Sequence, residues 1–167
     1  MRIIGIDPGL DGGVALLAPD ESPLVTPMPT QPTGKGSGRE VNVGYLVTDF
    51  GVLRGDVRVI IERQQPFPKQ GGVSNFTTGY NYGKLVALLE AEAVPFEVVR
   101  AQEWQKAFSI GGKGVNTKKQ AALKTARLFP CVELRATERC RTPHSGKVDA
   151  LLIAEYGRRK WQGGGHE

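Results

Sequence analysis

Three acidic residues lie in or directly after apolar segments, where an ionised carboxylate is unfavourable. Together they could hold divalent metal ions. Asp7 follows the apolar run RIIGI, Glu62 follows VRVII, and Asp149 joins the apolar stripe of DALLIAEYG. Charged side chains in such places are rarely buried without a partner. A shared divalent cation would satisfy all three carboxylates, so the sequence favours metal-assisted phosphodiester chemistry.

This chemistry sets the expected metal content. Hydrolysis of a phosphodiester needs an activated water and stabilisation of a developing negative charge, and two divalent ions about 3.5–4 Å apart can supply both. Mg²⁺ prefers oxygen ligands in octahedral geometry. We therefore expect two Mg²⁺ ions, with Mn²⁺ able to replace them. Asp7 would bridge the two ions, and Glu62 and Asp149 would each complete one ion's shell.

Each of these residues also has an ordinary structural explanation. An aspartate before Pro-Gly is often a turn residue. Glu62, beside Arg63, could be a solvated strand end, and Asp149 could complement the dipole of its helix. The occurrence of all three in this order is what favours the metal site.

Composition is typical of a protein with a single domain, which we expect over residues 1–161 with a disordered tail at 162–167. The chain of 167 residues has 22 Lys and Arg against 17 Asp and Glu, a net charge of +5. This balance suits a polyanionic partner, although many enzymes are as basic without binding nucleic acid. No apolar run approaches the ~20 residues of a membrane span, so we expect a cytoplasmic protein.

Apolar periodicity and turn signals predict a mixed α/β fold with about five strands flanked by helices. Residues 30–40 are rich in glycine and proline and predict a flexible loop. The expected strands are 2–6, 14–18, 24–28, 57–62 and 96–100. The expected helices are 42–53, one from near Asn81, a short one carrying Trp104 and Phe108 in the core, one from a T-x-x-Q capping box at Thr117, and one capped by Ser145.

The chain resembles the RuvC-like Holliday junction resolvases, which have the ribonuclease H-like fold. The resemblance rests on GIDPG at the start, IIER in the middle, a G-x3-G approach to the second helix and DALLIAEYG at the end. It implies a homodimeric, metal-dependent crossover-junction endodeoxyribonuclease that nicks four-way DNA junctions symmetrically. It also implies that Asp7, Glu62 and Asp149 are metal ligands. Relatives with the HSGK-D-ALLIAEYG ending include phage proteins as well as bacterial ones, so the source is open, with a leaning towards phage. The expected location is the cytoplasm of a bacterial cell, or of an infected host cell if the protein is phage-encoded.

One departure from the family pattern concerns a fourth ligand. Many relatives carry a carboxylate or histidine three residues before the last aspartate, where this chain has Gly146. His144 is the nearest candidate, and it could reach the metals only from the loop ahead of the helix, because i and i+5 do not share a helix face. It would ligate a metal or assist the scissile phosphate, unless it is a surface residue with neither role. We expect Lys147 to be solvated.

Junction recognition should rest on phosphate contacts, shape and stacking at unpaired bases. Phe67, between two prolines after Glu62, could wedge between base pairs or pack under its own loop. Phe76 or Tyr80 could share the wedge role. Lys118, at the start of a helix, resembles a family position where a lysine lies near the active site, so we group it with the catalytic residues. The predicted DNA contacts are Phe67, Lys69, Phe76, Lys84, Lys113, Lys118 and Lys119, with Arg63, Lys106, Arg135, Arg139 and Arg141 as further candidates.

Other functions remain open from the sequence. The chain could be a nuclease of broader branched-DNA specificity, acting on forks and flaps, or a non-catalytic DNA-binding domain of the same fold. A phosphotransferase of the actin-like superfamily also opens with a strand, an aspartate and a glycine turn, but it needs two such domains and a longer chain. Metal-dependent nicking, binding without cutting and ATP turnover would separate these classes.

Overall fold

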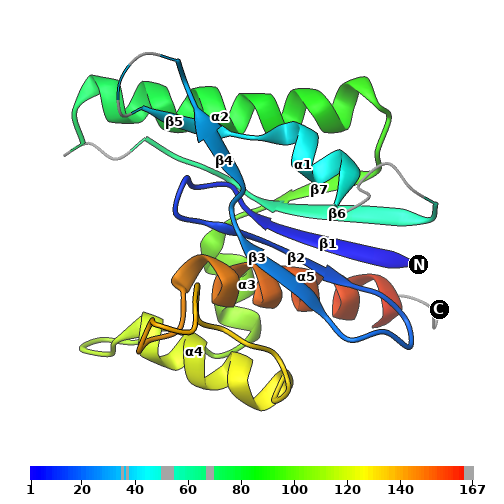
Figure 1. The fold of residues 1–167 in the computed structure, drawn as a ribbon. Helices are drawn as coiled ribbons and strands as arrows, with labels where there is room; N and C mark the ends of the chain where they lie inside the picture. Colours follow the sequence, from blue (N-terminus) through cyan, green and yellow to red (C-terminus); the bar gives the residue numbers. More distant parts are fainter. Residues whose placement is uncertain (35, 37, 50–54, 67–69, 164–167) are drawn as a thin grey trace.

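A mixed five-stranded sheet forms the centre of the protein (Figure 1). The computed structural model describes residues 1–34, 36, 38–49, 55–66 and 70–163. Strand order is β3-β2-β1-β6-β7, with β1, β6 and β7 parallel and β2 and β3 antiparallel to their neighbours. The predicted mixed α/β fold is therefore confirmed. The strands are β1 (Arg2–Asp7), β2 (Gly13–Leu17), β3 (Leu24–Pro27), β6 (Val57–Glu62) and β7 (Phe96–Val99).

Helices cover both faces of this sheet (Figure 1). One face carries α1 (Val43–Thr48) and α2 (Gly72–Ala91). The other carries α3 (Ala101–Ala107), α4 (Thr117–Leu128) and α5 (Ser145–Gly163). Within the described ranges no helix combines the length and the apolar character that crossing a membrane requires. The residues 164–167 of the expected tail lie outside the described part.

The central strand β1 feeds two separate cores because its side chains alternate between the faces of the sheet. Ile3 packs with the buried residues of α5, whereas Ile4 and Ile6 pack with those of α1 and α2. Gly5 faces α5, and a Cβ at this position would lie 2.4 Å from the carbonyl oxygen of Ala150. The first strand and the last helix are thus in direct backbone contact.

The prediction of a flexible loop over residues 30–40 was wrong, because β4 (Thr30–Pro32) and β5 (Arg39–Val41) pair as an antiparallel two-stranded sheet. Long-range contacts hold this hairpin on α2. The side-chain oxygen of Asn81 accepts a hydrogen bond from the backbone N–H of Val41 at 2.7 Å. The Lys84 ammonium lies 3.1 Å from the Glu40 carboxylate. These partners are about forty residues away in the chain, so local glycine and proline content does not reveal them.

Several predicted helix boundaries also shift. Helix α1 ends at Thr48 rather than near 53, and α2 begins at Gly72 rather than near Asn81. The cap of α4 is Asn116 rather than Thr117, since its side chain accepts the backbone N–H of Lys119 at 3.0 Å.

Candidate active site

Two of the three carboxylates lie at the same edge of the sheet because their strands are parallel neighbours. Ile6 of β1 pairs with Ile61 of β6, so Asp7 and Glu62 stand one step further along, at the carboxyl ends of both strands. Alternation along the strands puts both side chains on the face that α5 covers. Asp149 lies near the N-terminal end of α5, which faces this edge, at the left in Figure 1.

The three carboxylates lie close enough for their charges to act on one another. Burial raises the pKa of Asp7 to about 7, and the charges of Glu62 and then Asp149 add to this effect. Burial likewise raises the pKa of Asp149 to about 7, with a further contribution from Glu62 and an opposing one from Lys118. The three groups repel one another when ionised, so a cation among them would be stabilising.

The donor set therefore fits a hard divalent cation, although the carboxylates do not form a closed cage. In the part of the chain that the structure describes, no three His, Cys, Asp or Glu side chains meet the geometry of a complete metal site. Mg²⁺ keeps several of its waters and is commonly bound through one or two carboxylates together with substrate phosphates. An open cluster of Asp7, Glu62 and Asp149 is compatible with such binding.

Glu62 has a partner that sequence reasoning missed. The indole N–H of Trp104, in α3, donates a hydrogen bond to Oε2 of Glu62 at 2.7 Å. Burial raises the pKa of Glu62, and this hydrogen bond opposes the rise. The interpretation of Trp104 as a core residue holds, since its side chain is 1% exposed. The sequence feature that could have predicted this contact is the indole N–H, because a buried tryptophan usually needs a hydrogen-bond acceptor.

His144 lies at the start of α5 and takes the capping position that we predicted for Ser145. Its Nδ1 accepts a hydrogen bond from the backbone N–H of Lys147 at 3.3 Å. Burial lowers the pKa of His144, with the charge of Asp11 opposing and that of Lys147 adding to the shift. Because Nδ1 accepts this hydrogen bond, a neutral imidazole carries its proton on Nε2, which can donate to a phosphate. The role of His144 as a metal ligand stays a prediction.

Gly146, where the family resemblance led us to expect a fourth ligand, has no room for a side chain. A Cβ on Gly146 would lie 2.1 Å from the carbonyl carbon and oxygen of Gly12, in the turn between β1 and β2. A Cβ on Gly13 would in turn lie 2.4 Å from the carbonyl oxygen of Gly146. The missing fourth ligand is thus replaced by a backbone contact between this turn and α5.

The expectation that Lys147 is solvated was wrong, because this side chain is 6% exposed. Its ammonium group donates to the backbone carbonyl oxygens of Glu133 and Arg135, the second at 3.0 Å. Burial of an ammonium group without hydrogen-bond acceptors costs on the order of several kcal/mol. The two carbonyl oxygens offset this cost. Lys147 therefore ties the irregular segment before α5 to the first turn of that helix.

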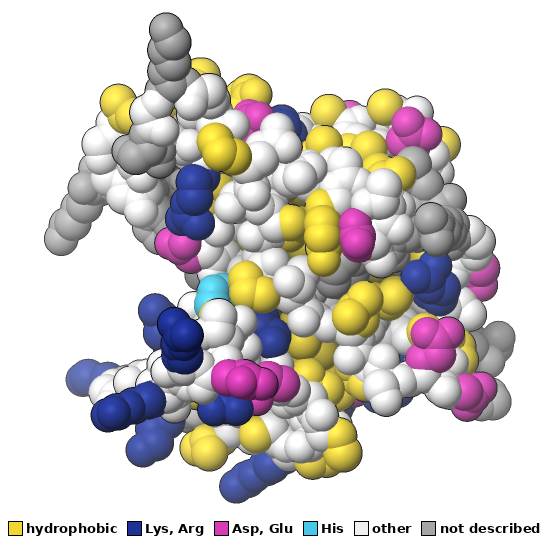
Figure 2. Space-filling model, in the orientation of Figure 1, with side chains coloured by type: hydrophobic (Ala, Val, Ile, Leu, Met, Phe, Trp, Pro, Cys, Tyr) yellow, Lys and Arg dark blue, Asp and Glu magenta, His cyan; other side chains and the backbone are white. Residues whose placement is uncertain are grey.

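A basic surface adjoins Asp149. Lys118 and Lys119, in the first turn of α4, line a pocket together with Asp149 and Asn116. The charge of Lys118 acts on Asp149, since it lowers the pKa of that carboxyl. Figure 2 shows Lys and Arg side chains gathered at the lower left, over α4 and the segment before α5, below a notch in the surface. Lys113, in the loop before α4, is exposed.

A second pocket lies between Asp7 and α2. It is lined by Asp7, Asp11 and residues of the first half of α2. On the same helix Phe76 is 74% exposed, and its ring stacks on that of Tyr80 with 6.4 Å between the centroids. Lys84 is engaged within the fold by Glu40 and by the carbonyl oxygen of Val41.

Two predicted DNA contacts, Phe67 and Lys69, lie outside the described residues. The chain leading to them borders the candidate site, because Gln65 and Pro66 line a pocket beside Glu62. The wedge role of Phe67 and the phosphate contact of Lys69 stay predictions.

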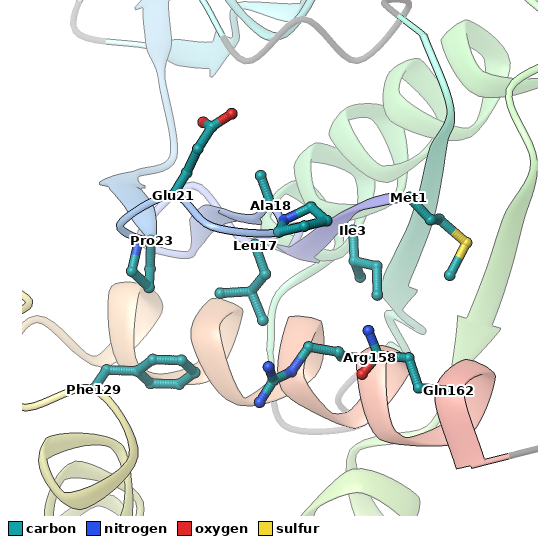
Figure 3. Close-up of a pocket in the computed structure, with 10 residues that line it drawn as sticks. Met1, Ile3, Leu17, Ala18, Glu21, Pro23, Phe129, Arg158 and Gln162 are labelled. Carbon is teal, nitrogen blue, oxygen red and sulfur yellow. The ribbon is translucent and has the colours of Figure 1, made fainter.

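Another pocket lies at the far end of β1 (Figure 3). It is bordered by Ile3 of β1, Leu17 of β2 and Arg158 of α5. Arg158 is held by the buried carboxylate of Glu155, at 2.7 Å. The lining includes none of the three clustered carboxylates, so this pocket is separate from the candidate site.

Comparison with solved structures identifies the fold. A structure of RuvC from T. thermophilus in complex with a Holliday junction substrate matches 98% of this chain and 97% of its own, with a TM-score of 0.57 and 17% identity. A second Thermus thermophilus RuvC structure gives a TM-score of 0.55 and 20% identity over the same shares. The chain has the RuvC fold. In sequence, by contrast, no family model matches it and no curated protein matches it significantly.

The match to RuvC spans almost the whole of both chains, so it includes every strand and helix that carries a candidate residue. At this level of identity it establishes the fold, and chemistry must be argued from the side chains of this protein.

Proposed function

We propose that this protein is a divalent-metal-dependent endonuclease that resolves four-way DNA junctions by paired, symmetric phosphodiester hydrolysis. The observation that carries the proposal is the meeting of Asp7, Glu62 and Asp149 at one edge of the sheet. There the charges of Glu62 and Asp149 raise the pKa of Asp7, and the charge of Glu62 raises the pKa of Asp149. One of the RuvC structures with this fold holds a Holliday junction. A cluster of carboxylates on the fold of a protein that binds a Holliday junction favours phosphodiester chemistry.

The chain's own residues suit the two tasks of such an enzyme, which are to bind the metal ions and to stabilise charge at the phosphate. Mg²⁺ bound at the three carboxylates would supply an activated water and charge stabilisation at the phosphate. Asp7 and Glu62, fixed at the ends of two paired strands, would hold their oxygens rigidly, and Asp149 would approach from α5. Lys118 would bring positive charge to the phosphate beside Asp149. His144, just before α5, would donate from Nε2 to the phosphate, or would act as a further metal ligand once the Lys147 hydrogen bond to Nδ1 is released.

DNA would lie between the basic surface at α4 and the aromatic pair on α2. Lys113, Lys118 and Lys119 would contact phosphates, which position a duplex without reading its sequence. Phe76 and Tyr80 would offer stacking surfaces on the other side of the carboxylates. The arms of a branched substrate could then be held apart across the site.

Cleavage of a synthetic four-way junction, with and without Mg²⁺, tests the proposal. Linear duplex and a flap of matched sequence are the comparison substrates, and Asp7→Asn is the inactive control. Paired nicks in the junction, dependent on metal, are the expected result. Equal cutting of the flap would favour a broader branched-DNA nuclease, and binding without cutting would favour a non-catalytic DNA-binding module.

Two symmetric nicks require two active sites related by a two-fold axis, so we propose that the protein acts as a homodimer. Sedimentation of the protein with and without the junction measures this directly. A complex of one protein molecule per junction that still makes paired nicks would contradict the dimer.

A further inference from the structure

We propose that Trp104 is a positioning residue that fixes the Glu62 carboxylate in the orientation that metal binding requires. The inference rests on the proposed metal site. Its physical basis is the hydrogen bond of 2.7 Å from the indole N–H to Oε2 of Glu62.

The chemistry of the two groups makes this contact directional. An indole N–H can donate but not accept, whereas each oxygen of an ionised carboxylate accepts. With Oε2 engaged by Trp104, Oε1 of Glu62 is the oxygen left to face a cation. The hydrogen bond therefore divides the carboxylate into one oxygen held by the protein and one available to a metal.

The protein core determines where the indole lies. Trp104 is 1% exposed and belongs to the core that also contains Ile60 and Val99. The carbonyl oxygen of Trp104 accepts the backbone N–H of Phe108, at the end of α3. A side chain locked in this way cannot follow Glu62 if the carboxylate turns, so Glu62 is oriented before a metal arrives.

Glu62 is anchored from its backbone as well. It pairs with Val99 of β7, and the N–H of Arg63 donates to the carbonyl oxygen of Val99 at 2.8 Å. Helix α3 follows β7 after a single residue, Arg100. One short segment of chain thus fixes both the backbone of Glu62, through β7, and its carboxylate, through α3.

A comparison of the two tryptophans tests this role. Trp104→Phe keeps an aromatic ring but removes the N–H, and Trp161→Phe makes the same change in α5, where the ring packs beside Arg58. Loss of an outer partner of a metal ligand typically costs about 10–100-fold in metal affinity. We expect the Mg²⁺ concentration that half-saturates thermal stabilisation to rise by that factor in Trp104→Phe and to stay unchanged in Trp161→Phe. Junction cleavage by Trp104→Phe should recover as Mg²⁺ is raised.

Fluorescence provides a second measurement that does not depend on the folding of Trp104→Phe. The chain has two tryptophans, so Trp104 is the sole one in Trp161→Phe. Its emission should change when Mg²⁺ is added, and also when Glu62→Gln is introduced. Emission that responds to neither, or a Trp104→Phe protein with the Mg²⁺ midpoint of the wild type, would overturn the role of Trp104.

The same experiments separate this inference from the proposed function. A wild-type protein that is stabilised by Mg²⁺ and cuts the junction, beside a Trp104→Phe protein with the same Mg²⁺ midpoint, overturns only the role of Trp104. A wild-type protein that neither responds to Mg²⁺ nor cuts overturns both.

Discussion

The backbone of Gly146 in α5 lies against the backbone of Gly12, in the turn after β1, with no space between them for a side chain. The turn that follows Asp7 and the helix that carries Asp149 are therefore locked together. The contact also leaves no space for a side chain, and so for a metal ligand, at position 146.

Replacing Gly146 by alanine should destabilise the protein, because the new Cβ would overlap the carbonyl group of Gly12. Overpacking of this kind costs about 1–3 kcal/mol. Gly83→Ala is the matched control, since a Cβ there meets nothing within 4 Å, and Gly to Ala inside a helix stabilises by about 0.5–1 kcal/mol. Urea denaturation measures both variants, and equal stabilities would contradict the close contact.

Asp7→Asn should abolish cleavage while leaving junction binding intact, since the lysines that would contact phosphate are unchanged. Loss of a metal ligand worth several kcal/mol in the transition state corresponds to a rate reduction on the order of 10³-fold. The metal-free variant should also melt at a higher temperature near neutral pH, because a buried charge beside Glu62 and Asp149 is removed. Single-turnover cleavage and a melting curve test the two outcomes, and cutting at the wild-type rate would refute the metal site.

The stability of the metal-free protein should fall as the pH rises from about 4 to about 7. Asp7 and Asp149 have pKa values of about 7 in the folded protein against 3.8 for the ordinary group. Over this range the unfolded chain releases protons that the folded chain retains, so unfolding becomes easier as the pH rises. Above the folded pKa the full destabilisation is present.

Mg²⁺ should therefore stabilise the protein more at about pH 8 than at about pH 5, because only ionised carboxylates bind the ion well. At a concentration of one hundred times Kd the expected gain is about 2.7 kcal/mol, which raises Tm by about 5–10 °C. Melting curves at the two pH values, with and without Mg²⁺, measure this difference. Equal shifts at both pH values would indicate ion binding elsewhere.

Lys118→Ala should slow cleavage on the order of 10²-fold, as removal of a charge-stabilising donor does at other sites. Lys118 lowers the pKa of Asp149, so the acid limb of the pH–rate profile should also move to higher pH. Lys124→Ala is the control, because this residue lies on the same helix but borders a different pocket, with Phe108 and Arg127. Similar pH–rate profiles for the two variants would indicate that Lys118 is an ordinary surface charge.

Phe76→Ala should weaken junction binding by about 5- to 150-fold, because stacking on a base contributes about 1–3 kcal/mol. The unfolding free energy should change little, since the ring is 74% exposed. Val73→Ala, at a position 84% exposed on the same helix, controls for general loss of apolar surface. Equal affinities of the two variants in a binding titration would exclude a stacking role for Phe76.

The carboxylate cluster could be predicted because its signals are local. An acidic residue at the end of a buried strand is visible in the sequence, and strands joined by a crossover tend to bring their carboxyl ends to one edge. The partners of these residues were harder to predict. The bond from Trp104 to Glu62 joins α3 to β6, and the bonds from Lys147 reach carbonyl groups in a segment without regular structure.

The errors in the fold have a related cause. Helix α2 begins in a stretch rich in Gly, Asn and Thr, residues with low helix propensity. The sequence therefore did not predict a helix over its first half. The β4–β5 hairpin contains Pro32 and several glycines, and contacts of Val41 and Glu40 with Asn81 and Lys84 hold it on α2. In both places tertiary contacts override the local preference of the residues.

The contact of β1 with α5 joins the first strand of the chain to its last helix. During synthesis Asp7 therefore leaves the ribosome well before Asp149 and the helix that covers this face of the sheet. A nascent or truncated chain that lacks α5 therefore holds two of the three acidic groups and exposes the apolar underside of its sheet. Such a chain would lack one carboxylate of the proposed metal site and would present apolar surface to proteases.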